Sequence, residues 1–99
     1  MGRFLETASA ASKARTSAGA VTAKTNSQTL VADTEGQRVG LYVTNEGAND
    51  VWLALGEKAE PQKGIYVKKE GGAATIDNYT GVVSVVTKTG ESNVTFAEL

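Results

Sequence analysis

Short runs of β-branched residues separated by turn-forming residues constrain the fold of this chain more than any other feature. Of the 99 residues, 25 are Val, Ile or Thr, and these residue types favour extended strands. Gly, Asn and Asp interrupt the runs at intervals of roughly ten residues, a spacing typical of all-β domains. Gly and Asn can adopt positive φ angles at turns with little steric cost. The expected turns are Glu46-Gly47-Ala48-Asn49, Gly71-Gly72, Asn78 and Thr89-Gly90.

The pattern predicts seven strands, at residues 28–32, 38–45, 50–55, 64–68, 73–77, 81–87 and 92–98. Seven short antiparallel strands are typical of a β-sandwich or a jelly-roll-like barrel. The single proline, Pro61, lies in the connection between the third and fourth of these strands, where it removes no ladder hydrogen bond. The sequence therefore predicts an all-β domain.

The first 27 residues differ in composition from the rest of the chain. They contain seven of the fourteen alanines and almost no large apolar side chain after Leu5, so this segment cannot form a core by itself. Residues 1–32 carry four basic and one acidic side chain, whereas residues 33–99 carry six basic and ten acidic ones. We therefore expect an N-terminal arm, residues 1–27, that is extended or partly helical. A β-sandwich domain, residues 28–99, follows it.

The predicted strands carry more apolar surface than one core face needs. In the strand at residues 38–45, the alternating apolar residues are Val39, Leu41 and Val43. We expect these three side chains in the core and Tyr42 on the opposite face. The strands at residues 50–55 and 81–87 carry apolar residues on both faces, including Trp52. Because a sandwich covers one face of each sheet, we expect Tyr42 and Trp52 to contact the arm or a second subunit, unless the loop at residues 57–63 folds over this face.

The residues needed for most enzyme mechanisms are missing from the sequence. The chain contains no cysteine and no histidine, which excludes disulfides, thiolate nucleophiles, Cys/His metal sites and imidazole-based catalysis. Paired carboxylates occur at Glu57 and Glu60 and at Asp33 and Glu35, in a loop and a turn where acidic residues are solvated. No Gly-rich phosphate-binding loop opens a helix. We expect a protein that is not an enzyme, with no catalytic residue and no cofactor.

Metal ions, nucleic acids and membranes are also not expected as partners. Oxygen-bearing side chains crowd one predicted turn, at Asn45, Glu46, Asn49 and Asp50. They lack the spacing of an EF-hand loop, so we expect no metal. The net charge of −1 and the single basic pair Lys68-Lys69 argue against nucleic-acid binding. The longest apolar runs have five residues, far fewer than the ~20 that span a bilayer, and we expect no signal peptide.

The order of several short motifs in residues 28–99 resembles that of small structural proteins of tailed bacteriophages. The motifs are RVGLYVTN (residues 38–45), EGAN (46–49), DVWLALG (50–56), GIYV (64–67), YTGVVSV (79–85) and VTFAEL (94–99). The resemblance implies a virion component without enzymatic activity. The expected role is that of a capsid decoration (cement) protein, which binds the outside of the head lattice. A tail, neck or head-fibre component is the neighbouring alternative.

For such a protein, the expected partners are the major capsid protein or another virion protein. We also expect a homo-oligomer, with a trimer favoured, because a domain of this size buries a thin core. Each lattice contact can be weak, since many copies add avidity. The expected location is the virion, assembled in the host cytoplasm. The expected partner-binding residues are Arg3, Phe4, Leu5 and Arg15 in the arm, and Tyr42 and Trp52 on the sheet face.

A carbohydrate-binding β-sandwich module is the competing class of protein. Exposed aromatic rings stack on sugar rings, and nearby amides and carboxylates bind sugar hydroxyls. In this interpretation the aromatic platform consists of Trp52, Tyr66 and Tyr79. The polar contacts come from Asn45, Asn49 and Asp50.

Overall fold

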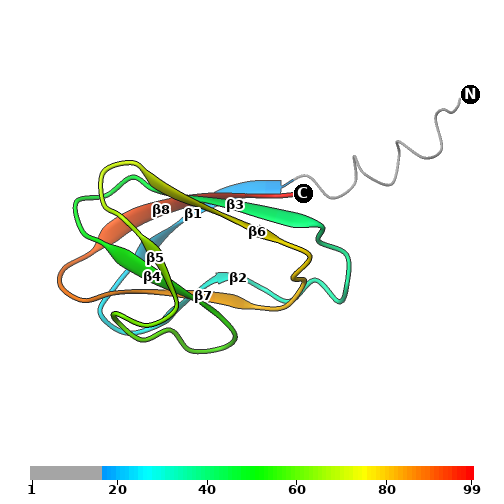
Figure 1. The fold of residues 1–99 in the computed structure, drawn as a ribbon, viewed down its shortest axis with the longest axis horizontal. Helices are drawn as coiled ribbons and strands as arrows, with labels where there is room; N and C mark the ends of the chain where they lie inside the picture. The colour runs from blue at the N-terminus through cyan, green and yellow to red at the C-terminus, as the bar shows by residue number, and fades with distance from the viewer. Residues whose placement is uncertain (1–16) are drawn as a thin grey trace, which may run out of the picture.

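Two four-stranded antiparallel β-sheets face each other in residues 17–99, the part of the chain that the computed structural model describes (Figure 1). The strands are β1 (Ser17–Ala23), β2 (Gln28–Val31), β3 (Gly40–Asn45), β4 (Val51–Leu55), β5 (Ile65–Val67), β6 (Gly72–Asp77), β7 (Val83–Thr87) and β8 (Ser92–Glu98). One sheet has the order β1-β8-β3-β6, and the other has the order β2-β7-β4-β5. The prediction of an all-β sandwich is confirmed. Nowhere in residues 17–99 is there a helix long and apolar enough to cross a membrane.

Strand β1 lies in the segment that the composition assigns to the arm. It pairs with β8 over seven residues, from Ser17 opposite Glu98 to Ala23 opposite Ser92. The sandwich therefore includes residues 17–27, and the predicted boundary at residue 27 falls after its first strand. Composition missed β1 because Ala and Gly, which are poor strand formers, make up most of it.

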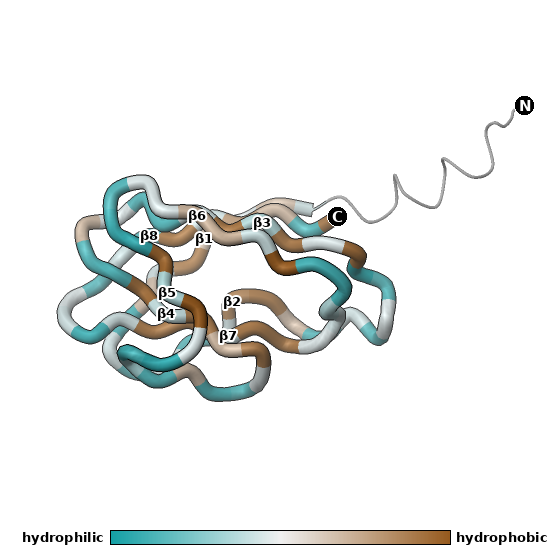
Figure 2. The backbone as a smooth tube through the Cα atoms, viewed as in Figure 1, coloured by the Kyte–Doolittle hydropathy of each residue, from teal (hydrophilic) through white to brown (hydrophobic). Residues whose placement is uncertain are grey.

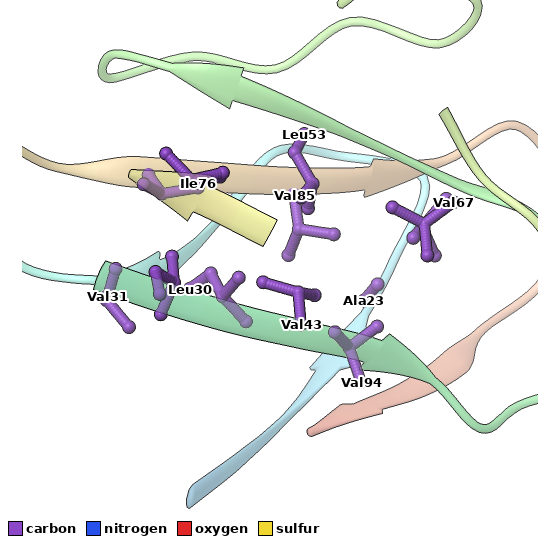
Figure 3. Packing of buried hydrophobic residues seen from close by; sticks show 12 residues of the cluster. Ala23, Leu30, Val31, Val43, Leu53, Val67, Ile76, Val85 and Val94 are labelled. Carbon is purple, nitrogen blue, oxygen red and sulfur yellow. The ribbon is translucent and has the colours of Figure 1, made fainter. Parts of the chain in front are cut away.

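The core consists of aliphatic side chains from the inner faces of both sheets (Figure 3). Figure 2 shows hydrophobic residues concentrated in the strands and hydrophilic residues in the connections. Phe96 and Tyr79 are only partly buried and pack against the edge of this cluster. The buried members are Ala23, Leu30, Val31, Leu41, Val43, Val51, Leu53, Val67, Ile76, Val83, Val85 and Val94.

Val39 is a correction to the predicted core. Leu41 and Val43 are buried as expected, but Val39 is 67% exposed. It lies before the first residue of β3, where its N–H donates to the Leu99 carbonyl and its carbonyl accepts from Asn78. At this position Arg38, which is 1% exposed, enters the interior instead.

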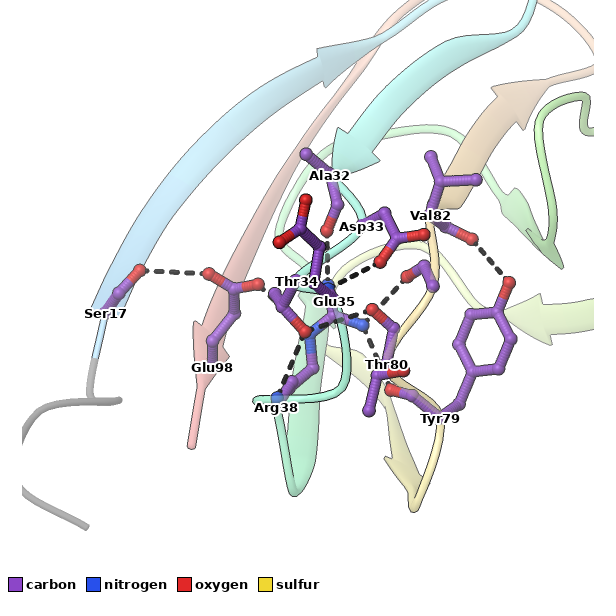
Figure 4. Close-up of polar contacts among 11 residues, drawn as sticks. Ser17, Ala32, Asp33, Thr34, Glu35, Arg38, Tyr79, Thr80, Val82 and Glu98 are labelled. Atoms are coloured by element: carbon purple, nitrogen blue, oxygen red, sulfur yellow. Dashed lines mark hydrogen bonds and ion pairs between the residues drawn. The ribbon is translucent and has the colours of Figure 1, made fainter. Parts of the chain in front are cut away.

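The Arg38 guanidinium joins three segments at one end of the sandwich (Figure 4). Its Nε atom donates to the Glu98 carboxylate at 3.0 Å. Its Nη1 atom donates to the carbonyls of Tyr79 and Gly81, and its Nη2 atom donates to the carbonyl of Ala32. The buried charge is thus paired and hydrogen-bonded, the condition under which a buried arginine is tolerated. It fixes the β2–β3 and β6–β7 connections against β8.

The β4–β5 loop covers part of the outer face of the second sheet (Figure 1). Ser84, on the outer face of β7, donates its hydroxyl hydrogen to the Gly56 carbonyl. Ala59 donates its N–H to the Ser27 hydroxyl and is 3% exposed. Val86, which shares the outer face of β7 with Ser84, is 1% exposed. One alternative that the sequence leaves open is that the loop at residues 57–63 folds over the outer apolar face. For β7 this alternative is correct.

Candidate functional site

Trp52 and Tyr66 form an aromatic pair on the outer face of the β2-β7-β4-β5 sheet. They are direct register partners on β4 and β5, so their side chains project from the same face. Their ring centroids are 5.5 Å apart with an interplanar angle of 39°. Tyr66 is half exposed, and Trp52 is partly buried. This outer face therefore offers aromatic surface beside the part covered by the β4–β5 loop.

A pocket of about 200 Å³ lies at the end of this aromatic pair. Trp52 forms one wall, and the turns after β3, β5 and β7 supply polar groups. The Asp50 carboxylate accepts a hydrogen bond from the backbone N–H of Lys69 at 2.9 Å, and the Asn49 amide donates to the Glu91 carbonyl. Both contacts fix side chains beside the aromatic ring. The lining residues are Ala48, Asn49, Asp50, Trp52, Lys69, Lys88 and Thr89.

The phenol of Tyr66 is electrostatically coupled to this pocket. Partial desolvation raises the pKa of Tyr66 above its ordinary value, and a hydrogen bond to the Asp50 side chain and the charge of that carboxylate raise it further. The phenol thus stays protonated and remains a hydrogen-bond donor over the physiological pH range. The aromatic pair and the pocket form one surface, which we call the Trp52 site: Trp52, Tyr66, Asn49, Asp50, Lys69 and Lys88.

Two of the residues expected to bind sugar are not part of this site. The side chain of Asn45 is fully buried and donates to the carbonyls of Asn49 and Val67. Its oxygen accepts hydrogen bonds from the Gly47 N–H and the Ser92 hydroxyl, so Asn45 fixes the β3–β4 turn. Tyr79 lies at the Arg38 end of the sandwich, where its hydroxyl donates to the carbonyl of residue 82. Among residues 17–99, no three acidic side chains cluster in a way that could hold a metal ion.

Tyr42 and Trp52, expected on a common binding face, lie on opposite sides of the sandwich. Tyr42 projects outward from β3 in the first sheet and is 48% exposed. Trp52 projects outward from β4 in the second sheet. The local alternation predicts that each side chain faces away from the core, but it contains no information on which sheet each strand joins. The other expected contact residues, Arg3, Phe4, Leu5 and Arg15, lie outside the described residues.

The end of the sandwich where β1 begins is acidic. Residues 17–99 carry ten acidic and seven basic side chains, and the whole excess lies at this end, because acidic and basic side chains balance in the remaining loops. Ser17 contacts Glu98 there, and Thr34 hydrogen-bonds to Thr80 across the two neighbouring loops (Figure 4). The charged residues of this acidic end are Asp33, Glu35, Asp77 and Glu98, with Arg38 as the one basic residue.

Sequence reasoning missed two features of these surfaces. Lys69 and Lys88 border the Trp52 site, although the sequence shows Lys69 only as part of a basic pair. Strand β1 forms an exposed sheet edge, although its small residues resemble those of the arm. No protein-family model matches the chain, and no curated protein sequence or solved structure shows significant similarity to it.

Proposed function

We propose that the chain is a non-enzymatic structural protein of a tailed-bacteriophage virion, a capsid decoration protein that binds the head lattice. The contacts are made by one outer sheet face and by the arm. Because β1 begins at Ser17, the arm comprises residues 1–16. The partner is the major capsid protein or another virion protein, and the protein joins the virion during assembly in the host cytoplasm. A tail, neck or head-fibre position is the alternative within the same proposal.

The observation that carries this proposal is the apolar core that both sheets form within residues 17–99. Twelve buried apolar residues from both sheets form it, so we infer that the sandwich folds without residues 1–16. They include three basic side chains and one acidic side chain. A basic segment joined to a domain that folds without it can bind a repeated surface. Each contact can be weak, because many bound copies add avidity.

The motifs that resemble phage structural proteins also contact one another in the fold. Arg38 begins one motif and donates to the carbonyls of Tyr79 and Gly81, which begin another. Asn45 ends the first motif and binds the carbonyl of Val67, which ends a third. The resemblance therefore rests on residues that hold the loops and strands of the sandwich together. It supports an architecture shared with those phage proteins.

Immunogold labelling of purified phage particles tests the proposal. An antibody raised against residues 17–99 is applied to density-gradient-purified virions that carry the gene, and mass spectrometry checks the same fraction for peptides of this chain. Label over the head supports a decoration protein, and label on the neck, tail or fibres supports the alternative. Particles with neither label nor peptides contradict a virion role.

Carbohydrate binding is a second candidate function because of the Trp52 site. Trp52 and Tyr66 form a partly exposed aromatic pair with ring centroids 5.5 Å apart, and Asn49 and Asp50 lie beside it in a pocket of about 200 Å³. Aromatic surface next to a few fixed polar groups is typical of sugar sites. Two of the six residues expected for such a site, Asn45 and Tyr79, are not part of it.

Tryptophan fluorescence tests this candidate directly, because Trp52 is the only tryptophan. A saturable shift in emission on titration with neutral and acidic oligosaccharides supports a sugar site. Tyr66→Ala should abolish that shift, whereas Tyr42→Ala, which changes an exposed tyrosine on the opposite outer face, should leave it intact. An unchanged spectrum with every oligosaccharide argues against the module.

A further inference from the structure

The hydrogen-bond ladder shows which backbone groups of β1 have no partner in the described sheet. Gly40 and Leu99 exchange both backbone hydrogen bonds, at 3.2 and 2.9 Å, in register with the β3–β8 ladder. Because antiparallel ladders alternate, the odd-numbered residues of β8 bond to β3 and the even-numbered ones bond to β1. The partners of those even-numbered residues in β1 are Ser17, Gly19, Val21 and Ala23. The N–H and C=O groups of Ala18, Ala20 and Thr22 therefore point away from the sheet.

Strand β1 is also the least protected of the four sheet edges in residues 17–99. It has seven residues, with no charged side chain, proline or register shift. Strand β2 has four residues and a register shift, β5 has three residues, and β6 ends at Asp77. Edge strands are normally protected by such features against pairing with another chain. The absence of all of them from β1 marks this edge as a pairing surface.

Apolar side chains at this edge are only partly covered. The ring of Phe96 lies over Gly19, so that a Cβ atom there would come within 2.9 Å of the ring. Phe96 and Val21 are partly buried against the core, while residues 17–20 are exposed. A strand added beside β1 would bury both the free backbone groups and this apolar surface.

We propose that β1 pairs antiparallel with β1 of a second copy, about a two-fold axis through Ala20. In this register Ala18 faces Thr22 of the second copy and Ala20 faces Ala20, so every free N–H meets a carbonyl. Val21 of the second copy then lies opposite Gly19, beside the Phe96 ring. The two sandwiches share one continuous eight-stranded sheet.

A second copy of the chain suits this edge. Strand β1 is already ordered in each copy, so the pairing costs little conformational entropy. The edge is also self-complementary, because it is uncharged and has small side chains, as a two-fold interface requires. Such an interface closes at two copies, so the proposal is a dimer, whereas the sequence favours a trimer. The pairing does not depend on a virion role.

A proline substitution tests the pairing without breaking the sandwich. Ala20→Pro removes an outward N–H that is not part of the β1–β8 ladder, and proline is tolerated at such edge positions. Light scattering coupled to size exclusion should give about twice 10.3 kDa for the full chain and the monomer mass for Ala20→Pro. Thr75→Pro, at an equivalent outward position on β6, is the matched control and should remain dimeric. A monomeric or trimeric full chain, or a dimeric Ala20→Pro variant, overturns the proposal.

Cysteine cross-linking tests the register even if the proline variant fails to fold. The chain has no cysteine, so Ala20→Cys introduces a single thiol. Facing residues of a hydrogen-bonded antiparallel pair have Cα atoms about 5.5 Å apart, within the range that a disulfide spans. Mild oxidation should convert Ala20→Cys to a covalent dimer and leave Thr75→Cys largely monomeric. Equal cross-linking of the two variants contradicts the two-fold axis through Ala20.

Discussion

Arg38 is the residue on which one end of the sandwich depends. Its side chain is fully buried and bonds to the Glu98 carboxylate and to three backbone carbonyls. Removing one partner of a buried ion pair leaves the other partner unsatisfied, and such changes typically cost about 3–5 kcal/mol. We expect Arg38→Met to lower the free energy of unfolding, measured by urea denaturation, by about this amount.

Two control variants separate this network from ordinary charge effects. Arg38→Lys keeps the positive charge but has fewer N–H donors in a different geometry, so its loss of stability should be intermediate. Lys63→Met breaks the exposed ion pair with Glu60 and should cost less than about 1 kcal/mol. If Arg38→Met costs no more than Lys63→Met, Arg38 does not hold this end of the sandwich.

The titration of Tyr66 reports on the Trp52 site. Desolvation and Asp50 raise the pKa of Tyr66 above 10.0, so its ionisation should require a higher pH in the folded protein than in the unfolded chain. The resulting stabilisation is present below the ordinary tyrosine pKa and is lost as the pH rises through the raised one. The titration is followed by absorbance at alkaline pH in a variant with Tyr42→Phe and Tyr79→Phe. Adding Asp50→Asn should lower the midpoint, and an unchanged midpoint excludes coupling to Asp50.

The limits of sequence-based prediction are clear at single residues. Alternation correctly places Leu41 and Val43 in the core, because a regular strand exchanges faces at every residue. It fails at Val39, where the regular strand has not yet begun and Arg38 turns inward to find four oxygen acceptors. These acceptors come from two loops and from β8, which are far apart in the sequence, and no local pattern contains that information.

At the scale of elements, β1 divides the N-terminal segment into two parts with different roles. Its residue Val21 pairs with Val94, which is fully buried in β8. Deleting residues 1–16 should leave the eight strands intact and, in 1 M NaCl, the thermal unfolding midpoint nearly unchanged. Deleting residues 1–27 should remove the cooperative transition, because it uncovers Val94 and leaves the edge of β8 unpaired. Circular dichroism melts of the two truncated chains check both outcomes.

A cooperative transition in the shorter chain, residues 28–99, would show that β1 is dispensable for folding. The boundary predicted from composition would then be the functional one. Loss of the transition in residues 17–99 would instead place part of the folding unit within residues 1–16.

The strands themselves were predictable wherever the apolar pattern was strong. All seven predicted strands occur within two residues of their expected bounds, since β-branched runs and turn residues delimit them. The pairing of Trp52 with Tyr66 was not predictable, because it depends on how the loop between β4 and β5 sets their register. The separation of Tyr42 from Trp52 was not predictable either, because consecutive strands β3 and β4 join different sheets.

At the scale of the whole molecule, salt should act differently on the charged surfaces and on the proposed strand pairing. The pairing through β1 uses backbone hydrogen bonds and apolar contacts, neither of which salt screens. The acidic end carries the excess negative charge of residues 17–99, and the chain continues from this end into residues 1–16, where basic side chains outnumber acidic ones. Added salt should therefore affect contacts of the arm and leave the dimer intact.

We expect residues 1–16 to stabilise the sandwich only at low salt. Several exposed charge pairs contribute about 1 kcal/mol in total when unscreened, and 1 M salt reduces the screening length to about 3 Å. The full chain should therefore exceed the chain 17–99 in free energy of unfolding by about 1 kcal/mol at low ionic strength, and the two should coincide in 1 M NaCl. A full-length variant with Asp33→Asn and Asp77→Asn should lose most of the difference at low salt. Equal salt dependence of the full and truncated chains would show that the arm does not contact the acidic end, and would leave its basic residues free for a partner.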